Sequence, residues 1–156
     1  MTTEFHWQVK SFEQLSPVEL FDYLKLRQAV FIVEQTCAYP DIDDTDKLAH
    51  HLLGYKGGLL VACARLIPAN VTYEHPSIGR IATHAQARGS GLGRQLMTHC
   101  VSTMHDLYPG QTIKIGAQQY LENFYQSFGF ETTSDVYLED GIPHIDMVLE
   151  SPDQQP

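Results

Sequence analysis

Basic residues are scarce in this sequence. Its 156 residues include ten lysines and arginines against nineteen aspartates and glutamates, which gives a formal charge of −9 at pH 7. The few basic residues stand singly along the chain. A nucleic-acid binder needs clustered Lys and Arg to neutralise phosphates, so the composition argues against a nucleic-acid partner. An acidic surface instead favours cationic small molecules.

Long apolar runs and paired cysteines are also absent. No apolar stretch approaches the ~20 residues that a membrane helix needs, so we expect a soluble protein with no membrane partner. The cysteines Cys37, Cys63 and Cys100 are odd in number, show no C-x-x-C spacing and follow no signal-like apolar leader. We interpret them as reduced thiols of a cytoplasmic protein.

Metal-binding spacings are missing as well. His50 and His51 have no Cys-x-x-Cys or His-x-x-x-His partner nearby. Asp41 begins a segment similar to the start of an EF-hand loop, but Asp46 stands where glycine is needed and Leu52 stands where the bidentate glutamate belongs. We therefore assign no metal.

The hydrophobic pattern predicts one α/β domain. With 43% apolar residues the chain can build one core, so we expect residues 1–150 to form a single domain and residues 151–156 a flexible polar tail. Ser16, Pro17 and Glu19 form a capping box that predicts a helix start. Alternation and helical spacing predict strands over 5–12, 52–55, 59–67, 78–83, 112–117, 130–138 and 144–149, and helices from residue 17 to about 34, over 92–107 and over 121–128.

The most informative segment runs from Arg88 to Arg94, with the sequence R-G-S-G-L-G-R. It follows a predicted strand and opens a predicted helix. Three glycines let the backbone approach a ligand closely, and the free amides of the helix start favour phosphate. A plain turn would also use glycine. No Walker lysine and no G-x-G-x-x-G order is present.

The R-x-x-G-x-G spacing resembles the acetyl-CoA pyrophosphate loop of the GNAT acyltransferase superfamily. The Y-x-x-x-G-F pattern from Tyr125 to Phe130 is similar to that family's last helix, and the strings at 31–46 and 139–144 resemble its ElaA-like branch. The resemblance implies the GNAT acyl-CoA N-acyltransferase fold, a mixed and mostly antiparallel central sheet flanked by helices. A short second helix is expected within residues 41–48.

The resemblance also implies roles for particular residues. Tyr125 would be the general acid that protonates the departing CoA thiolate, although it could equally be one more member of an apolar helix face. Gln118 stands where many relatives have asparagine, which leaves its contact to the cofactor open. The expected contacts to acetyl-CoA are Ile81, Ala82, Thr83, Arg88, Gly89, Ser90, Gly91, Leu92, Gly93, Arg94 and Gln118.

The acceptor amine needs a proton acceptor, because an alkylamine of pKa near 10 is almost fully charged at pH 7. The expected fourth strand contains no acidic residue. Candidates from elsewhere are Glu34 and His144, then Asp43, His51 and His84, or a water chain. Glu34 and the acidic run 41–46 could form a negative wall for a cationic acceptor, or the run could be a solvated loop.

Two hypotheses of different class follow. The first is an N-acetyltransferase that transfers the acetyl group of acetyl-CoA to a small-molecule or peptide amine by direct attack in a ternary complex. The alternative is a non-catalytic GNAT-like module that senses CoA or docks a partner protein. A weaker third route uses Cys37, Cys63 or Cys100 as an acyl-carrying nucleophile. The oligomeric state is left open, a homodimer included.

Overall fold

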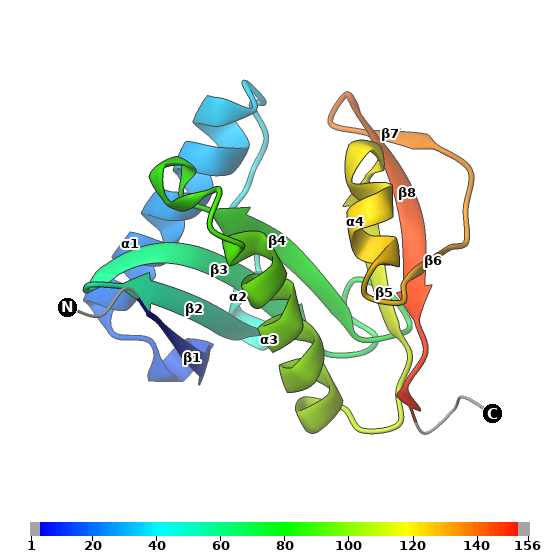
Figure 1. The fold of residues 1–156 in the computed structure, drawn as a ribbon, viewed down its shortest axis with the longest axis horizontal. Helices are drawn as coiled ribbons and strands as arrows, with labels where there is room; N and C mark the ends of the chain where they lie inside the picture. The colour runs from blue at the N-terminus through cyan, green and yellow to red at the C-terminus, as the bar shows by residue number, and fades with distance from the viewer. Residues whose placement is uncertain (1–3, 153–156) are drawn as a thin grey trace.

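An eight-stranded sheet with helices on both faces forms the framework of the computed structural model, which describes residues 4–152 (Figure 1). The strand order is β1-β2-β3-β4-β5-β8-β6, with β7 beside β8, and all neighbours are antiparallel except β4 and β5. The predicted mixed, mostly antiparallel sheet is confirmed. The strands are β1 Phe5–Ser11, β2 His50–Lys56, β3 Leu59–Ile67, β4 Ser77–Thr83, β5 Ile113–Gln118, β6 Glu131–Thr132, β7 Tyr137–Glu139 and β8 Ile142–Leu149.

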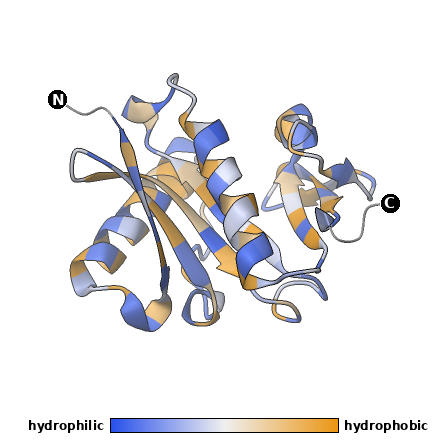
Figure 2. Ribbon diagram, turned by 60° about the horizontal axis from the view of Figure 1, so that its bottom comes forward, coloured by the Kyte–Doolittle hydropathy of each residue, from blue (hydrophilic) through white to orange (hydrophobic). Residues whose placement is uncertain are grey.

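The helices cover the sheet from opposite sides. α3 (Leu92–Leu107) packs against β3 and β4 on one face, and α1 (Pro17–Arg27) packs against the same strands on the other. Neighbouring residues of a strand point to opposite faces, so Leu52 belongs to the α3 core and Leu53 to the α1 core. Figure 2 shows hydrophobic residues along the central strands. The remaining helical segments are η1 Phe12–Gln14, η2 Gln28–Glu34, α2 Thr45–Leu48, η3 Ala85–Ala87, η4 Gln119–Leu121 and α4 Glu122–Gln126.

The first helix begins as predicted and changes type halfway. Ser16 Oγ accepts a hydrogen bond from Glu19 N, and Ser16 N donates one to Glu19 Oε1, which completes the predicted capping box. After Arg27 the chain continues as a π-helix to Glu34. Single π turns inside helices occur often at functional sites. Here the π turn accounts for the apolar periodicity that loosens toward Glu34.

Arg27, the last residue of α1, is fully buried. Its Nε lies 3.0 Å from Asp41 Oδ2, its Nη1 lies 2.7 Å from Asp46 Oδ1, and its Nη2 donates to the Asp41 carbonyl oxygen. Burying a charge is costly unless it is paired and hydrogen-bonded. These contacts satisfy that requirement and tie the acidic segment to α1.

Two further arginines from the sheet pair with the same acidic segment. Arg65 Nη1 on β3 lies 2.6 Å from Asp43 Oδ1 and 3.1 Å from Asp46 Oδ1. Arg80 Nε on β4 lies 2.8 Å from Asp41 Oδ1. Both interpretations of residues 41–46 are therefore wrong for Asp41 and Asp46, which are buried and paired with arginines. The short helix expected within 41–48 is confirmed as α2.

Two other expectations need correction. The strand expected over 130–138 is broken into β6 and β7, because Ser134 Oγ and the Thr133 amide bond the backbone of Asp146 and end the regular pairing. Ser151, the first residue of the expected flexible tail, is buried, and residues 153–156 lie outside the described part. Within residues 4–152, no helix has the length and apolar character needed to cross a membrane.

We predict that Asp46→Asn lowers the free energy of unfolding by about 3–5 kcal/mol, because it leaves the Arg27 charge buried with one partner fewer. Burial alone would raise the pKa of Asp46, but hydrogen bonds and charges from Arg27 and Arg65 outweigh it and lower the pKa. A depressed pKa contributes stability above the unfolded value of about 3.9 and loses it as pH falls through the folded value. The difference between variant and wild type should therefore shrink below about pH 4.

Urea denaturation at pH 7 and pH 3.5 measures this effect. Asp44→Asn is the matched control, because Asp44 belongs to the same segment but its ion pair with Lys47 is exposed. Equal stabilities for the two variants at pH 7 would contradict the importance of the buried network.

Candidate functional site

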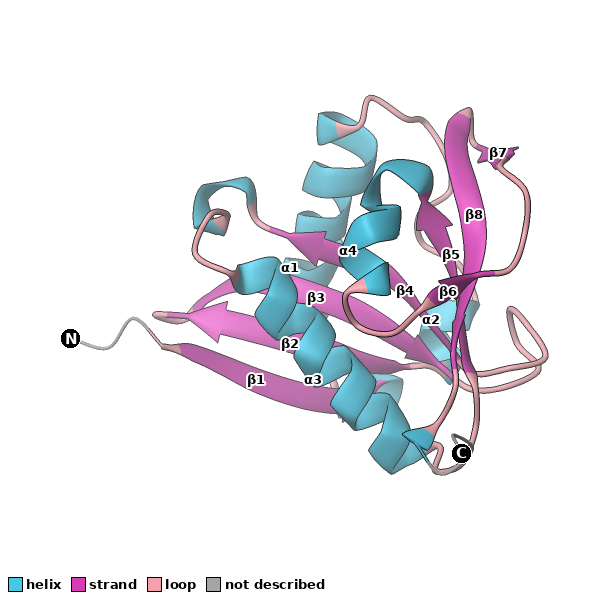
Figure 3. Cartoon of the chain, turned by 45° about the vertical axis from the view of Figure 1, so that its right-hand side comes forward, coloured by secondary structure: helices cyan, strands magenta, loops and turns pink. Residues whose placement is uncertain are grey.

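Strands β4 and β5 diverge after a single paired position (Figures 1 and 3). That position pairs Ser77 with Lys114. A cavity of about 820 Å³ is lined by residues of both strands. One part of the lining comes from the end of β4, the loop after it, α3 and α4. The other part comes from β3, the loop 68–76 and the β7–β8 turn. The cavity therefore lies between β4 and β5, and both groups of residues border it.

A bulge in β4 forms one wall of the cavity. Ala62 pairs with Thr83 and Cys63 with Ala82, but Arg65 pairs with Gly79, so Arg80 and Ile81 together oppose one residue of β3. Arg80 has φ +48°, which is uncommon for a residue with a side chain. A bulge bends the strand and redirects its side chains. The expected contact residues Ile81, Ala82 and Thr83 follow directly and all line the cavity.

The glycine-rich loop precedes α3 as predicted. Gly89 has φ +94° and Gly91 has φ +79°, and a Cβ added at either would meet no atom within 4 Å. Gly91 is the N-cap of α3 and supplies no side chain, so the first amides of the helix are free for an anion. Gly93 lines the cavity. This open backbone fits a diphosphate.

The side chains of the other loop residues have different surroundings. Leu92 is buried in the core, so only its backbone can reach a ligand. Ser90 lines a second hollow of about 520 Å³. Arg94 donates to Ser127 Oγ at 3.1 Å and lies over the Phe128 ring, so its side chain links α3 to α4.

Arg88 and Glu34 form a bridge beside the cavity. Arg88 Nη1 and Nη2 lie 2.8 and 3.0 Å from the two carboxylate oxygens of Glu34. Arg88 also donates to the side chain and the carbonyl of Thr83. The pair joins the end of the π-helix to the end of β4. Glu34 thus faces an arginine, and the negative wall expected there is wrong.

Tyr125 on α4 lines the cavity and is only 6% exposed. Its ring packs at steep angles against Phe124 and Phe130. Burial raises the pKa of Tyr125, so the hydroxyl stays protonated at neutral pH. The structure is compatible with Tyr125 as a packing residue and as a general acid, since its ring packs in the apolar face while the residue also borders the cavity.

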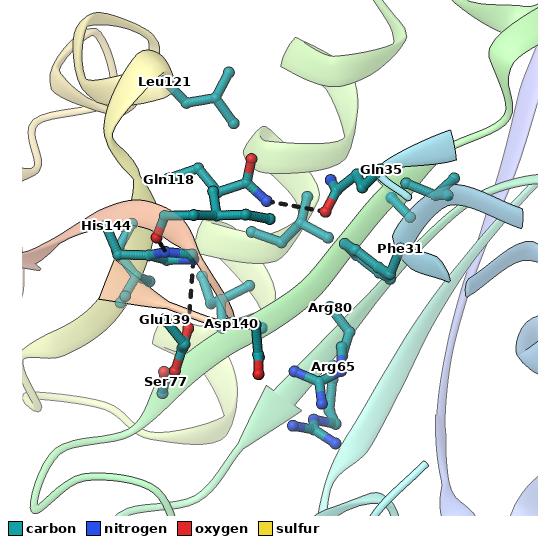
Figure 4. Close-up of a pocket in the computed structure, with 18 of the residues that line it drawn as sticks. Phe31, Gln35, Arg65, Ser77, Arg80, Gln118, Leu121, Glu139, Asp140 and His144 are labelled. Atoms are coloured by element: carbon teal, nitrogen blue, oxygen red, sulfur yellow. Dashed lines mark hydrogen bonds and ion pairs between the residues drawn. The ribbon is translucent and has the colours of Figure 1, made fainter. Parts of the chain in front are cut away.

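His144 on β8 lies across the cavity from the β4 wall (Figure 4). Its Nδ1 is 2.7 Å from the Ile142 carbonyl oxygen, and a carbonyl can only accept, so Nδ1 carries a proton. In the neutral ring the lone pair is then on Nε2, which lies 3.3 Å from Glu139 Oε2. The ring also stacks on Tyr137. Nε2 of His144 thus faces a carboxylate that can accept a hydrogen bond from it when this nitrogen is protonated.

Of the other predicted positions, two line the cavity and two have structural contacts elsewhere. Gln118, at the end of β5, lines the cavity and donates to Gln35 Oε1 at 3.4 Å (Figure 4). His51 is fully buried between the Tyr23 hydroxyl and the Asp46 carbonyl, and burial lowers its pKa, so its role is structural. His84 accepts from Gln86 N and caps η3. Asp43 lines the cavity, paired with arginines.

Sequence reasoning missed Arg65 and Arg80 as cavity residues. Both line it, from β3 and from the bulge of β4. A signal was available, because an arginine inside an apolar strand such as 59–67 must find a partner. The surplus of aspartates at 41–46 supplied the other half of that signal.

A split sheet with a bulged strand on one side of the gap and a glycine-rich helix start beside it defines an acyl-CoA N-acyltransferase. Residues 19–151 match the acetyltransferase (GNAT) domain family, and the chain belongs to this family. Membership implies a CoA thioester as the acyl donor.

Relatives and solved structures agree on the branch. Protein ElaA of Escherichia coli K12 is 44% identical over 146 residues, 92% of this chain and 95% of that protein. Its crystal structure matches with a TM-score of 0.89 at 42% identity, over 94% of this chain and 100% of that one. An acyl-CoA N-acyltransferase from Pseudomonas aeruginosa matches with a TM-score of 0.89 at 36% identity, over 94% and 99%. The resemblance to the GNAT superfamily and its ElaA-like branch is confirmed.

We predict that Gly91→Ala weakens CoA binding about tenfold to a hundredfold, the equivalent of one charge-assisted amide hydrogen bond. The positive φ at Gly91 also strains an alanine by about 1–2 kcal/mol. Gly58→Ala is the matched control, because Gly58 has φ +81° and open surroundings in the β2–β3 turn, away from the cavity. Calorimetry with CoA should separate two variants that are equally destabilised.

Gly93→Ala gives a second test without backbone strain. A Cβ there would meet Phe124 Cζ at 3.9 Å, an ordinary contact, and alanine favours the helix by roughly 0.5–1 kcal/mol. The variant should be as stable as wild type and bind CoA more weakly. Wild-type CoA affinity in both Gly91→Ala and Gly93→Ala would contradict the assignment of this loop.

Proposed function

We propose that the protein is an N-acetyltransferase that transfers the acetyl group of acetyl-CoA to an amine by direct attack in a ternary complex. The observation that carries the proposal is the cavity through the split sheet. It borders the glycine-rich loop and Tyr125 at one part and His144 at the other. A donor and an acceptor could therefore enter from different sides and meet between β4 and β5.

The donor part offers groups for each region of a CoA thioester. The amides of residues 89–94 would hold the diphosphate at the start of α3. Beyond Ser77, the edge of β4 that faces β5 has no strand paired to it within the described residues. Open strand edges bind extended ligands through main-chain hydrogen bonds. The backbone of residues 81–83 would hold the amide arm there, with Gln118 on the opposite strand.

The acyl group supplied by acetyl-CoA would lie next to the bulge of β4. A backbone amide at this position can donate to the carbonyl oxygen, which gains negative charge during attack. The positive φ of Arg80 fixes the direction of the following peptide, and Asp41 holds the Arg80 side chain. This arrangement supports a preorganised hydrogen-bond donor at the bulge, because the network that holds Arg80 is already formed.

Tyr125 would protonate the departing thiolate. Its raised pKa keeps the proton available, and the same rise makes the proton harder to release, so the rate gain lies at the low end of general-acid catalysis. His144 Nε2 would take the proton of the attacking amine. Glu139 then accepts a hydrogen bond from the protonated ring at the observed 3.3 Å separation.

The acidic groups near His144 suit the ammonium form of the acceptor. Glu139 and Asp140 line the same part of the cavity, so a cationic amine would enter on their side. Direct attack is favoured over a cysteine carrier, because Cys63 and Cys100 are fully buried and burial raises the pKa of both thiols, that of Cys63 to about 12. The unpaired cysteines also support a reducing, cytoplasmic location.

We predict that Tyr125→Phe lowers the maximal rate about a hundredfold while folding and CoA affinity survive, because the phenyl ring keeps the packing against Phe124 and Phe130. Because the tyrosine pKa is raised, wild-type kcat should show no fall attributable to Tyr125 up to about pH 9. A screen of CoA release with amines, peptides and aminoglycosides measures both effects.

An unchanged rate in Tyr125→Phe would make Tyr125 a packing residue. If the wild-type protein binds CoA but releases none with any acceptor, the non-catalytic CoA-binding module replaces the enzyme as the better description.

We predict that His144→Gln lowers kcat/KM about a hundredfold at pH 7, since the amine loses its proton acceptor. The neutral fraction of an amine of pKa near 10 rises about tenfold per pH unit, so the variant should recover as pH rises from 7 to 9 more steeply than wild type. His6→Gln, at an exposed position on β1, is the control. A pH profile of His144→Gln parallel to that of wild type would exclude His144 as the base.

A further inference from the structure

Two arginines stand side by side on one wall of the cavity. Arg65 and Arg80 lie below Phe31, and His144 and Glu139 lie on the opposite side (Figure 4). Arg65 is only 5% exposed, so its charge is held inside the protein. Neither guanidinium takes part in the proton transfers described above. Both pair with the acidic segment, and this pairing leaves some of their hydrogen-bond donors unused.

Every carboxylate oxygen of the acidic residues around these arginines already has a donor close by. Asp41 Oδ1 accepts a hydrogen bond from Tyr39 and lies 2.8 Å from Arg80 Nε in an ion pair, and Asp41 Oδ2 accepts from Arg27. Both oxygens of Asp43 and both oxygens of Asp46 also have a donor within hydrogen-bond distance. Asp43 Oδ1 accepts from Arg65 and the Thr45 amide, and Asp43 Oδ2 accepts from Arg80. Asp46 Oδ1 accepts from Arg27 and Arg65, and Asp46 Oδ2 accepts from the Asp43 amide.

The arginines, in contrast, have donors left over. Arg65 uses only Nη1, its Nε is buried without a hydrogen-bond partner, and its Nη2 has none among the described residues. Arg80 leaves Nη1 unused by the same measure. Nε and Nη2 form one edge of the planar guanidinium, the edge that binds carboxylates with two parallel hydrogen bonds. The wall can therefore accept an anionic group that brings oxygen acceptors.

We infer that the acceptor is a free amino acid, whose carboxylate binds Arg65 and Arg80 while its amine faces His144 and Glu139. This inference rests on the proposed function for the position of the reacting amine. Arg80 directly precedes Ile81, and neighbouring strand residues are about 3.3 Å apart. The Arg80 side chain, which lines the same cavity, would then hold an anionic group near the reacting nitrogen. An α-amino acid meets this condition, whereas a polyamine or an aminoglycoside carries no carboxylate.

The first test changes the ligand and leaves the protein intact. Turnover by the wild-type enzyme with acetyl-CoA is measured for the common amino acids, and for each substrate its carboxamide and its decarboxylated amine are measured as well. The inference predicts kcat/KM about tenfold to a hundredfold higher for the carboxylates, which is the value of a charge-assisted bidentate contact. Equal or better turnover of the amides would overturn the inference while the proposed function stands.

The second test changes the wall. In Arg65→Lys, which keeps the charge and loses the planar edge, and in Arg80→Gln, the preference for carboxylate over amide should fall toward one, mainly through KM. Amide turnover should change little in Arg65→Lys. Lys25→Gln, which removes an exposed cation on α1, should keep the preference. Thermal unfolding and CoA calorimetry check that each variant is folded. A preference that survives in both arginine variants would overturn the inference.

Binding separates this inference from the proposed function. Calorimetry of amino acids and their amides with the CoA-bound protein reports carboxylate selectivity even where no acetyl transfer occurs. Selective binding that is lost in Arg80→Gln, without turnover, would retain the anionic ligand and reject the enzyme. Binding without selectivity, or none, would overturn the inference whatever the turnover.

Discussion

The buried charge of Arg27 is the constraint on which much of this structure depends. A guanidinium with no exposed surface must be surrounded by acceptors, and the chain supplies them from a segment fourteen to nineteen residues away. Asp41 and Asp46 then need further partners of their own, which they find on β3 and β4. The result is a connected series of ion pairs that runs from Arg27 at the end of α1, through Asp41 and Asp46, to Arg65 and Arg80 at the cavity wall.

The first helix changes from α to π geometry directly after Arg27, the residue at which this series of ion pairs begins. Arg27 closes α1, and the π turn begins at the next residue. The wider turn brings Phe31 and Gln35 to the cavity and places Glu34 opposite Arg88. A regular helix would present a different set of side chains after Arg27, because the residues per turn would differ. The position of the donor loop is thus tied, through Glu34, to a charge buried deep behind the sheet.

Much of the fold could be predicted from the sequence, because its signals are local. The capping box at Ser16, the glycines before α3 and the apolar run of β3 are each local signals within one segment, and each of these elements was found where expected. The fragmentation into β6 and β7 was missed because Ser134 and Thr133 bond Asp146, a contact that no local pattern contains. The site divides in the same way. Tyr125 and the loop residues carry motifs, whereas the pairs of Arg27, Arg65 and Arg80 join positions up to 39 residues apart.

The same distinction explains the wrong interpretation of the acidic segment. Counted along the chain, Asp41 to Asp46 is a run of negative charge, and its expected role was attraction or solvation. In the folded protein Asp41, Asp43 and Asp46 each meet an arginine from another element, and Asp44 pairs with Lys47, so the local charge nearly cancels. The net effect on a ligand comes from which hydrogen-bonding groups remain unused.

Helix α3 has a consequence for how the two halves of the sheet hold together. Strands β4 and β5 meet at one residue pair, yet the buried face of α3 shares a single core with residues of both halves, from Leu52 and Ile78 to Ile113 and Met147. Side-chain packing therefore replaces the missing backbone pairing between the halves. The sheet can stay open along β4 without coming apart, because its cohesion there comes from the core beneath α3 and not from the hydrogen bonds of a ladder.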